Sequence, residues 1–178
     1  MISAPQPEAV DAGADILNLG GNAIDAAIAC AFVQGVVDPL MCGIGGFGSM
    51  QLFMPKLKVH ECIDFHGKAP EQATPNMWAD RIEGEARDGF GFILKDHIND
   101  IGYQSITAPG SLKAYYEAHR DYGVLDWKTI LQPAIEYAEN GWVVRPHVDF
   151  WWSIKNHFGR TPNPDRVKFS QPGRDLYC

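Results

Sequence analysis

The chain has 178 residues, of which 46% are hydrophobic and 21% are charged, and its length predicts one globular domain with a buried core. Its formal net charge is -7 and its Lys and Arg residues are scattered, so the concentrated basic face that nucleic-acid binding requires is absent from the sequence. No stretch reaches the roughly 18 apolar residues of a membrane span. No secretory signal opens the sequence, so we expect a cytoplasmic location and no membrane partner.

The cysteines and histidines give little sign of a metal centre. The four cysteines show no C-x-x-C pairing, and a free thiol in an apolar run behaves as a small hydrophobe. His60 and Cys62 could share a metal, but no second ligand pair has a suitable spacing. We therefore expect no metal site. Four histidines are interpreted as structural or solvated, namely His60, His119, His147 and His157.

Two helices are predicted at the start of the chain. The first covers Pro7–Leu19, where proline suits the first turn, and Gly20 and Gly21 supply a left-handed stop. Asn22 follows as a candidate N-cap, with Asp25 in the position of a capping-box acid, and we interpret both as capping rather than catalytic groups. The second helix, AIDAAIACAFVQGVV, is apolar on nearly every face, so we expect it to have neighbours on several sides.

The next segment, MCGIGGFG, has three glycines in the G-x-G-x-x-G register of a dinucleotide-binding turn. Such a turn follows a strand and opens a helix, because the helix N-terminus holds the pyrophosphate. Here a predicted helix precedes the glycines and a predicted strand follows them. We therefore expect no dinucleotide and no other cofactor, and we interpret Gly45 and Gly46 as packing glycines that allow close backbone contact.

A β-hairpin and two less regular regions complete the pattern around the later helices. Alternating apolar residues in SMQLFM and VHECIDF, with a turn at Pro55–Lys58 between them, predict the hairpin. From 69 to 108 we expect a long loop region with a short helix near Thr74–Glu83. Residues 146–178 are rich in aromatic residues and proline and show no clear periodicity, which predicts an irregular tail.

Two further helices are predicted between these irregular regions. Ser111 is the candidate cap of the first, which Gly123 ends. Asp126 is the candidate cap of the second, which Gly141 stops. Pro133 lies within this second helix, where we expect it to cause a bend or to start a new segment.

Several of these segments resemble one known family. They are SAPQPEAVDAGADILNLGGNAIDAAIACAFVQGVVDPLMCGIGGFGSM, then IDFHGKAP, and then TAPGSLKAYYEAHRDYG followed by LQPAIEYAENGW. Together they resemble the N-terminal part of the large subunit of the γ-glutamyltransferase (γ-glutamyltranspeptidase) family, over residues 3 to 150. The resemblance implies an α+β fold. Residues 1–178 would form part of an αββα sandwich of the N-terminal-nucleophile hydrolase type, truncated at the end of this sequence.

The resemblance also implies a chemistry. Members of the family hydrolyse or transfer γ-glutamyl groups of glutathione-type amides, with an amine or water as acceptor. The nucleophile is an N-terminal threonine of a small subunit cut from the same precursor, and its own α-amino group takes the proton. We expect no catalytic residue in this chain, because its threonines stand in the wrong contexts, as at Thr74, Thr107, Thr129 and Thr161.

One position departs from the family pattern. The family has an arginine after the strand residues DF, and it binds the α-carboxylate of the γ-glutamyl group. This chain has His66 there, in DFHGKAP, and we expect His66 to be a substrate-binding residue. An imidazole does not reproduce a bidentate guanidinium contact. Three cations are alternative replacements for the arginine charge, namely Lys68, Arg81 and Arg87.

Two other functions stay open on this sequence. One is a related amidase or acylase of the same fold with a different acyl substrate, because the residues of the pocket decide such specificity. The other is a non-catalytic fragment or binding module. The chain after residue 178 would distinguish these, since a threonine after a processing junction is required for catalysis.

Overall fold

A computed structural model describes residues 1–155 and 158–178, and His157 lies outside the described residues. The chain forms two compact units where its length predicts one domain. Unit 1 comprises Met1–Lys68 and Pro109–Val144, and unit 2 comprises Ala69–Ala108 and Arg145–Cys178. Both units are therefore built from two separate stretches of sequence, and each is described by itself.

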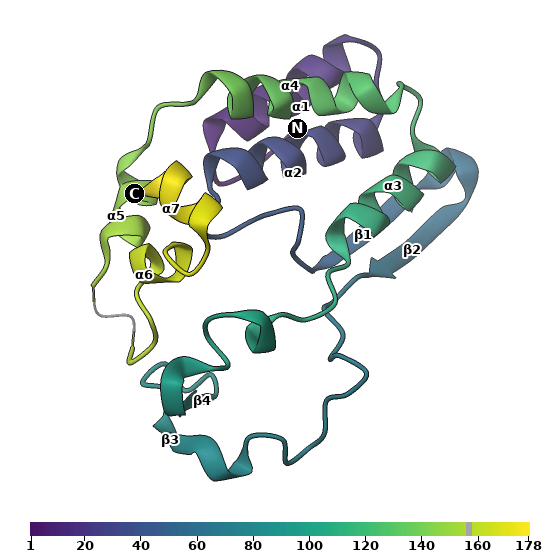
Figure 1. Ribbon diagram of the computed structural model, residues 1–178. Coiled ribbons are helices and arrows are strands. Elements are labelled where there is room, and N and C mark those ends of the chain that lie inside the picture. Colours follow the sequence, from purple (N-terminus) through teal and green to yellow (C-terminus); the bar gives the residue numbers. More distant parts are fainter. Residues whose placement is uncertain (156–157) are drawn as a thin grey trace. The chain divides into compact units, whose positions relative to one another are not determined.

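Unit 1 combines four helices with one β-hairpin (Figure 1). Its elements are α1 (Pro7–Asn18), α2 (Ala23–Val37), β1 (Ser49–Met54), β2 (Val59–Asp64), α3 (Ser111–Tyr122) and α4 (Trp127–Asn140). The two strands are antiparallel, with Ser49 opposite Asp64 and Met54 opposite Val59, and they confirm the predicted hairpin. The alternation of apolar residues works as expected, since Leu52 is buried while Gln51 and Phe53 are exposed.

Helix α2 forms the centre of unit 1. It contacts α1, α3 and α4, and Figure 1 shows α1, α2 and α4 side by side. Ile28, Ala29 and Val33 of α2 are completely buried. Of its apolar residues only Ala23 and Ala27 are exposed, so neighbours within this same chain cover the apolar surface that the sequence predicted.

The helix boundaries follow local chemistry that is largely visible in the sequence. Asn22 caps α2 through a complete capping box with Asp25, as predicted. Asp126 caps α4 through the Thr129 amide, and α4 continues through Pro133 without a second start. The prediction for α3 was wrong by one residue: its N-cap is Gly110, and Ser111 is the first helical residue.

Unit 2 has short elements only. They are β3 (Ile82–Glu85), β4 (Phe92–Leu94), α5 (Pro146–Ser153), α6 (Asn163–Val167) and α7 (Gln171–Tyr177), with 3-10 turns at Ala79–Arg81, Lys95–His97 and Tyr103–Ser105. Of the short helix predicted near 74–83, the structure contains only the 3-10 turn Ala79–Arg81, since residues 75–78 form turns and β3 begins at Ile82. Gly89 and Gly91, both at positive φ, lie in the turn of the antiparallel β3–β4 hairpin.

The prediction of an irregular tail from 146 to 178 was also wrong. Each of the helices α5, α6 and α7 has proline in its first turn, at Pro146, Pro164 and Pro172. Proline lacks only an amide that would be unpaired at that position, so it starts a helix there although it breaks a helix interior. The frequent prolines thus mark helix starts.

Salt bridges connect the two sequence stretches of unit 2. Arg160 makes a bidentate pair with Asp88, with Nε–Oδ2 and Nη2–Oδ1 distances of 3.0 and 3.2 Å. Arg166 Nη2 lies 2.6 Å from Asp100 Oδ1, and the second oxygen of Asp100 accepts the amide of Thr161. These charge-assisted contacts join the β3–β4 region to the C-terminal helices.

Candidate functional site

The candidate site lies where strand β2 ends in unit 1. The Phe65 amide donates a 3.0 Å hydrogen bond to Gly48 O, so the pairing of the two strands continues one residue past Asp64. The Phe65 ring packs edge-on against Tyr115 of α3, with a centroid distance of 5.7 Å. A Cβ atom on Gly110 would lie only 2.5 Å from Phe65 O, so only glycine allows this close approach. The backbone before His66 is therefore held from two sides.

His66 itself is exposed and contacts two residues of unit 1. Its amide donates to Asp64 Oδ1 over 3.0 Å, and its Nδ1 lies 2.7 Å from the same oxygen. The ring of Phe47, from the glycine segment, lies 5.6 Å away at 37°. The exposed fraction of the His66 side chain is 62%, so a large part of the imidazole is accessible to another molecule.

The contact with His66 stabilises the ionised form of the Asp64 carboxyl. The backbone hydrogen bond from His66 lowers the pKa of Asp64, and the side-chain hydrogen bond from His66 lowers it further. Lys68 acts in the same direction with a weaker electrostatic effect. Asp64 is therefore a carboxylate at neutral pH, and an ionised carboxylate only accepts hydrogen bonds.

The glycine segment lies against a helix, but not in the manner of a dinucleotide-binding turn. Gly46 O accepts the amides of Gly110 and Ser111 over 3.1 and 3.2 Å, so a carbonyl of the chain itself occupies the start of α3. A Cβ on Gly46 would lie 3.1 Å from Gly43 O, which confirms Gly46 as a packing glycine. The same interpretation of Gly45 was wrong, because nothing lies within 4 Å of the Cβ position there.

Asn22 and Asp25 are structural, as predicted, but the sequence did not reveal their full role. Asp25 is completely buried and accepts the Asn22 amide as well as the amides of Val124 and Leu125. Nε2 of His119, whose side chain is 12% exposed, is 3.7 Å from Asp25 and 2.8 Å from Leu125 O. The hydrogen bonds from Val124 and Leu125 to Asp25 join positions about 100 residues apart, and no local pattern in the sequence signals them.

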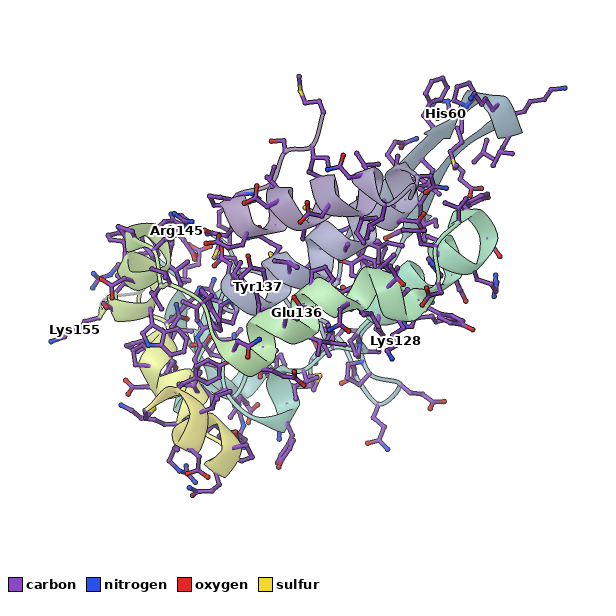
Figure 2. All side chains as sticks on the ribbon, turned by 90° about the horizontal axis from the view of Figure 1, so that it is seen from above. His60, Lys128, Glu136, Tyr137, Arg145 and Lys155 are labelled. Atoms are coloured by element: carbon purple, nitrogen blue, oxygen red, sulfur yellow. The ribbon has the colours of Figure 1, made fainter. Side chains whose placement is uncertain are left out.

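The other predicted residues are distributed over both units. Lys68 is exposed in unit 1, whereas Arg81 and Arg87 are exposed in unit 2. His60 is exposed on the hairpin, where it packs edge-on against Phe53 (Figure 2), and the His147 ring lies 6.4 Å from that of Trp151. Among the described residues, no group of three or more His, Cys, Asp or Glu side chains could hold a metal. All four cysteines are free thiols.

Each unit has a concave surface among its described residues, and His66 lines neither of these two. In unit 2, a cavity of about 690 Å³ has an apolar wall that includes Met77, Trp78 and Phe92. In unit 1, a groove of about 300 Å³ lies between α1 and α4, with Asp11 and Asp15 on one side and Glu136 and Tyr137 on the other (Figure 2). Within the described ranges, no helix is both long and apolar enough to cross a bilayer.

Comparison with known proteins identifies the class to which this fold and sequence belong. The family model described as gamma-glutamyltranspeptidase matches residues 9–175. The chain therefore belongs to the γ-glutamyltranspeptidase family, and the resemblance seen in the sequence is confirmed. The crystal structure of Helicobacter pylori γ-glutamyltranspeptidase is similar over 98% of this chain and 45% of that one, with a TM-score of 0.79 and 26% identity.

Relatives of more than one specificity are similar to this chain. Acylase ACY 1 proenzyme of Pseudomonas sp. (strain V22) is 40% identical over 83% of this chain and 26% of its own length. Glutathione hydrolase proenzyme of Bacillus subtilis (strain 168) is 37% identical over 81% of this chain and 23% of its own length. The crystal structure of a cephalosporin acylase from Bacillus halodurans has a TM-score of 0.71 and 34% identity, over 92% of this chain and 26% of that one. The chain thus spans about a quarter of the length of the curated relatives it matches.

Proposed function

We propose that this chain is the N-terminal part of an enzyme that hydrolyses γ-glutamyl amides of the glutathione type or transfers their acyl group to an amine. Membership of the γ-glutamyltranspeptidase family over residues 9–175 carries this proposal. The names of the relatives add support, since a glutathione hydrolase proenzyme is 37% identical to this chain. In the complete protein, unit 1 would be one part of an αββα sandwich.

The chemistry would be divided between this chain and a small subunit from the same precursor. An N-terminal threonine of that subunit would attack the amide carbonyl, and its own α-amino group would take the hydroxyl proton. The acyl-enzyme would then pass to water or to an amine acceptor. This chain would contribute to binding of the acyl group, through the exposed imidazole of His66.

We place His66 near the carboxylate of the acyl group. It follows a strand whose end is fixed by Gly48 O and by the close approach of Gly110 to Phe65. An imidazolium at this position would donate a charge-assisted hydrogen bond to a carboxylate, whereas a neutral imidazole would bind it weakly. This contact would replace the arginine of the family pattern.

A second candidate function is the cleavage of another acyl amide. Two observations favour it: histidine replaces the family arginine at position 66, and an acylase proenzyme is 40% identical to this chain. An acyl group without the α-carboxylate would lose no binding affinity at a site that lacks the guanidinium. The two candidates therefore differ in a single recognisable group of the substrate.

Three matched anilides would distinguish these functions in the complete, processed protein. The γ-glutamyl anilide carries the α-amino and the α-carboxylate group, the glutaryl anilide lacks only the amine, and the 4-aminobutyryl anilide lacks only the carboxylate. Under the first proposal, kcat/KM is highest for γ-glutamyl and falls at least about tenfold without the carboxylate, the loss expected for one charged hydrogen bond. Equal values for all three would contradict it and favour the second candidate.

A further inference from the structure

We infer that Asp64 is a positioning residue for His66, holding the imidazole with Nδ1 as the donor so that Nε2 is the atom presented to a ligand. This inference rests on the proposed function for its relevance to substrate binding, but its geometry stands on the contacts within unit 1. The three residues involved, Asp64, Phe65 and His66, form the end of the hairpin.

The first step is the direction of the hydrogen bond. Nδ1 of His66 lies 2.7 Å from Asp64 Oδ1, which is within normal hydrogen-bonding distance. Asp64 is ionised at neutral pH and has no proton to donate. Nδ1 must therefore carry the proton in this contact, whether the ring is neutral or cationic, and in the neutral ring Nε2 holds the lone pair.

The second step is the restriction of the ring. One oxygen, Oδ1 of Asp64, accepts both the His66 amide and the ring nitrogen, so the backbone and the side chain are fixed relative to the same atom. The Phe47 ring packs against the imidazole at 5.6 Å and limits its rotation from another side. Nε2 has no hydrogen-bond partner among the residues that the structure describes, and the side chain is 62% exposed.

The third step is the consequence for recognition. A neutral ring in this tautomer accepts at Nε2, so it suits an N–H or O–H group of a ligand. A protonated ring donates at Nε2 and suits a carboxylate. The charged groups beside this ring are Asp64 and, acting on Asp64, Lys68. Protonation of His66 would therefore change which ligand group the same atom binds, without any movement of the ring.

Nuclear magnetic resonance of the 178-residue chain with ¹⁵N-labelled histidine tests the geometry without any substrate. Above neutral pH we expect the His66 signals to show a protonated Nδ1 and an unprotonated Nε2. His60 serves as an internal control, since it also is an exposed hairpin histidine beside a phenylalanine, and its ring forms no ion pair with a carboxylate among the described residues. Its signals should show a mixture of tautomers. A His66→Gln variant assigns the resonances.

Two substitutions distinguish the effect of the Asp64 hydrogen bond from the effect of a nearby charge. Asp64→Ala should give His66 the tautomer mixture of His60, and Lys68→Ala, which changes a nearby charge but no hydrogen bond, should leave the tautomer as in the wild type. Both side chains are exposed, so the fold should persist. The inference is overturned if His66 and His60 show the same mixture in the wild type, or if Asp64→Ala leaves the His66 signals unchanged.

A kinetic measurement on the complete processed enzyme tests the role in binding. Asp64→Ala should lower the ratio of kcat/KM for the γ-glutamyl over the 4-aminobutyryl anilide roughly tenfold. An unchanged ratio would overturn the positioning role. Failure of the proposed function is distinguishable, because it would appear as no preference for the γ-glutamyl anilide in the wild type, whatever the tautomer of His66.

Discussion

Asn22 Nδ2 donates a 2.6 Å hydrogen bond to Tyr122 O, so the residue that caps α2 also fixes the end of α3, 100 positions further along the chain. Asp25 completes this junction from the same helix turn by accepting the amides of Val124 and Leu125. The same two side chains therefore cap α2 and connect it to the end of α3. Loss of either side chain would weaken this connection as well as the cap.

Replacing Asp25 with alanine should destabilise unit 1 by about 3 kcal/mol, because it removes a completely buried carboxylate and leaves three part-buried amides without this acceptor. Urea unfolding followed by circular dichroism measures this change. Asp15→Ala is the matched control, since Asp15 is an exposed carboxylate on α1, and we expect it to change stability by less than about 0.5 kcal/mol. Equal effects of the two substitutions would show that the junction contributes nothing specific.

Alanine at Gly110 should be costly because its Cβ would lie 2.5 Å from Phe65 O, and a backbone shift is needed to relieve the clash. We expect a loss of about 1–3 kcal/mol in unfolding free energy, typical of overpacking. Gly45→Ala is the control in the segment that contacts Gly110, with open space at its Cβ position. A Gly110→Ala protein as stable as Gly45→Ala would contradict the close approach at the end of β2.

Unit 2 should lose stability in acid through Asp88. The Arg160 hydrogen bond is the main cause that lowers the pKa of Asp88, followed by the Phe90 amide. Because the pKa is lower in the folded than in the unfolded state, the contribution is fully present above the unfolded value of about 3.9 and is lost as pH falls through the folded value. Hydrogen-exchange protection of the Ala86 amide, bonded to Gly91 O, reports this loss.

Asp88→Asn should remove most of this acid dependence while lowering protection at neutral pH. Asp165→Asn is the control in the same unit, because Asp165 pairs with Lys168 on an exposed surface. We expect its acid profile to follow the wild type. If the Asp88→Asn and wild-type profiles run parallel from about pH 5 to pH 3, the Arg160 pair is not the source of the acid sensitivity.

The 178-residue chain alone should show no amidase activity toward a γ-glutamyl anilide. The proposed threonine nucleophile and the donors that stabilise the oxyanion would both come from the small subunit. Release of the anilide is measured over a long incubation, with the complete processed protein as the positive control. Turnover by the chain alone that a His66→Ala substitution abolishes would place the chemistry in this chain and contradict the division proposed above.

Replacing His66 with arginine in the complete enzyme should strengthen binding of the γ-glutamyl anilide by about 1–2 kcal/mol, the gain from a permanent bidentate contact. KM should fall for the γ-glutamyl anilide and stay unchanged for the 4-aminobutyryl anilide, which lacks the carboxylate. An equal change of KM for both anilides would show that another residue binds the carboxylate.

Local signals in the sequence were sufficient for most of unit 1. Asn22 with Asp25, Asp126, and the alternation in β1 and β2 each predict an element that the structure contains. Contacts between distant positions could not be predicted, and the hydrogen bonds from the Val124 and Leu125 amides to Asp25 are an example, since no local pattern signals them. Prolines misled the prediction of the tail, because a sequence alone does not tell a first turn from an interior position.

The Asp64–His66 contact follows from the spacing of these two residues at the end of a strand. Side chains two positions apart lie on the same side of an extended segment, so D-F-H at a strand end places a carboxylate beside an imidazole. The replacement of the family arginine concerns the charge at position 66 and says nothing of its hydrogen-bond partner. The identity of its neighbour decides which nitrogen it presents, and that property is a feature of the pair.

The interleaved composition of the two units imposes an order on biosynthesis. A ribosome completes residues 69–108 long before it makes Arg160 and Arg166, whose partners Asp88 and Asp100 lie in that earlier stretch. Unit 1, by contrast, has its last residues when Val144 has been synthesised. Chains fold as their parts become available during translation. The nascent β3–β4 segment would therefore lack its salt-bridge partners, while unit 1 is already complete, until the helices α5 to α7 emerge from the ribosomal exit tunnel.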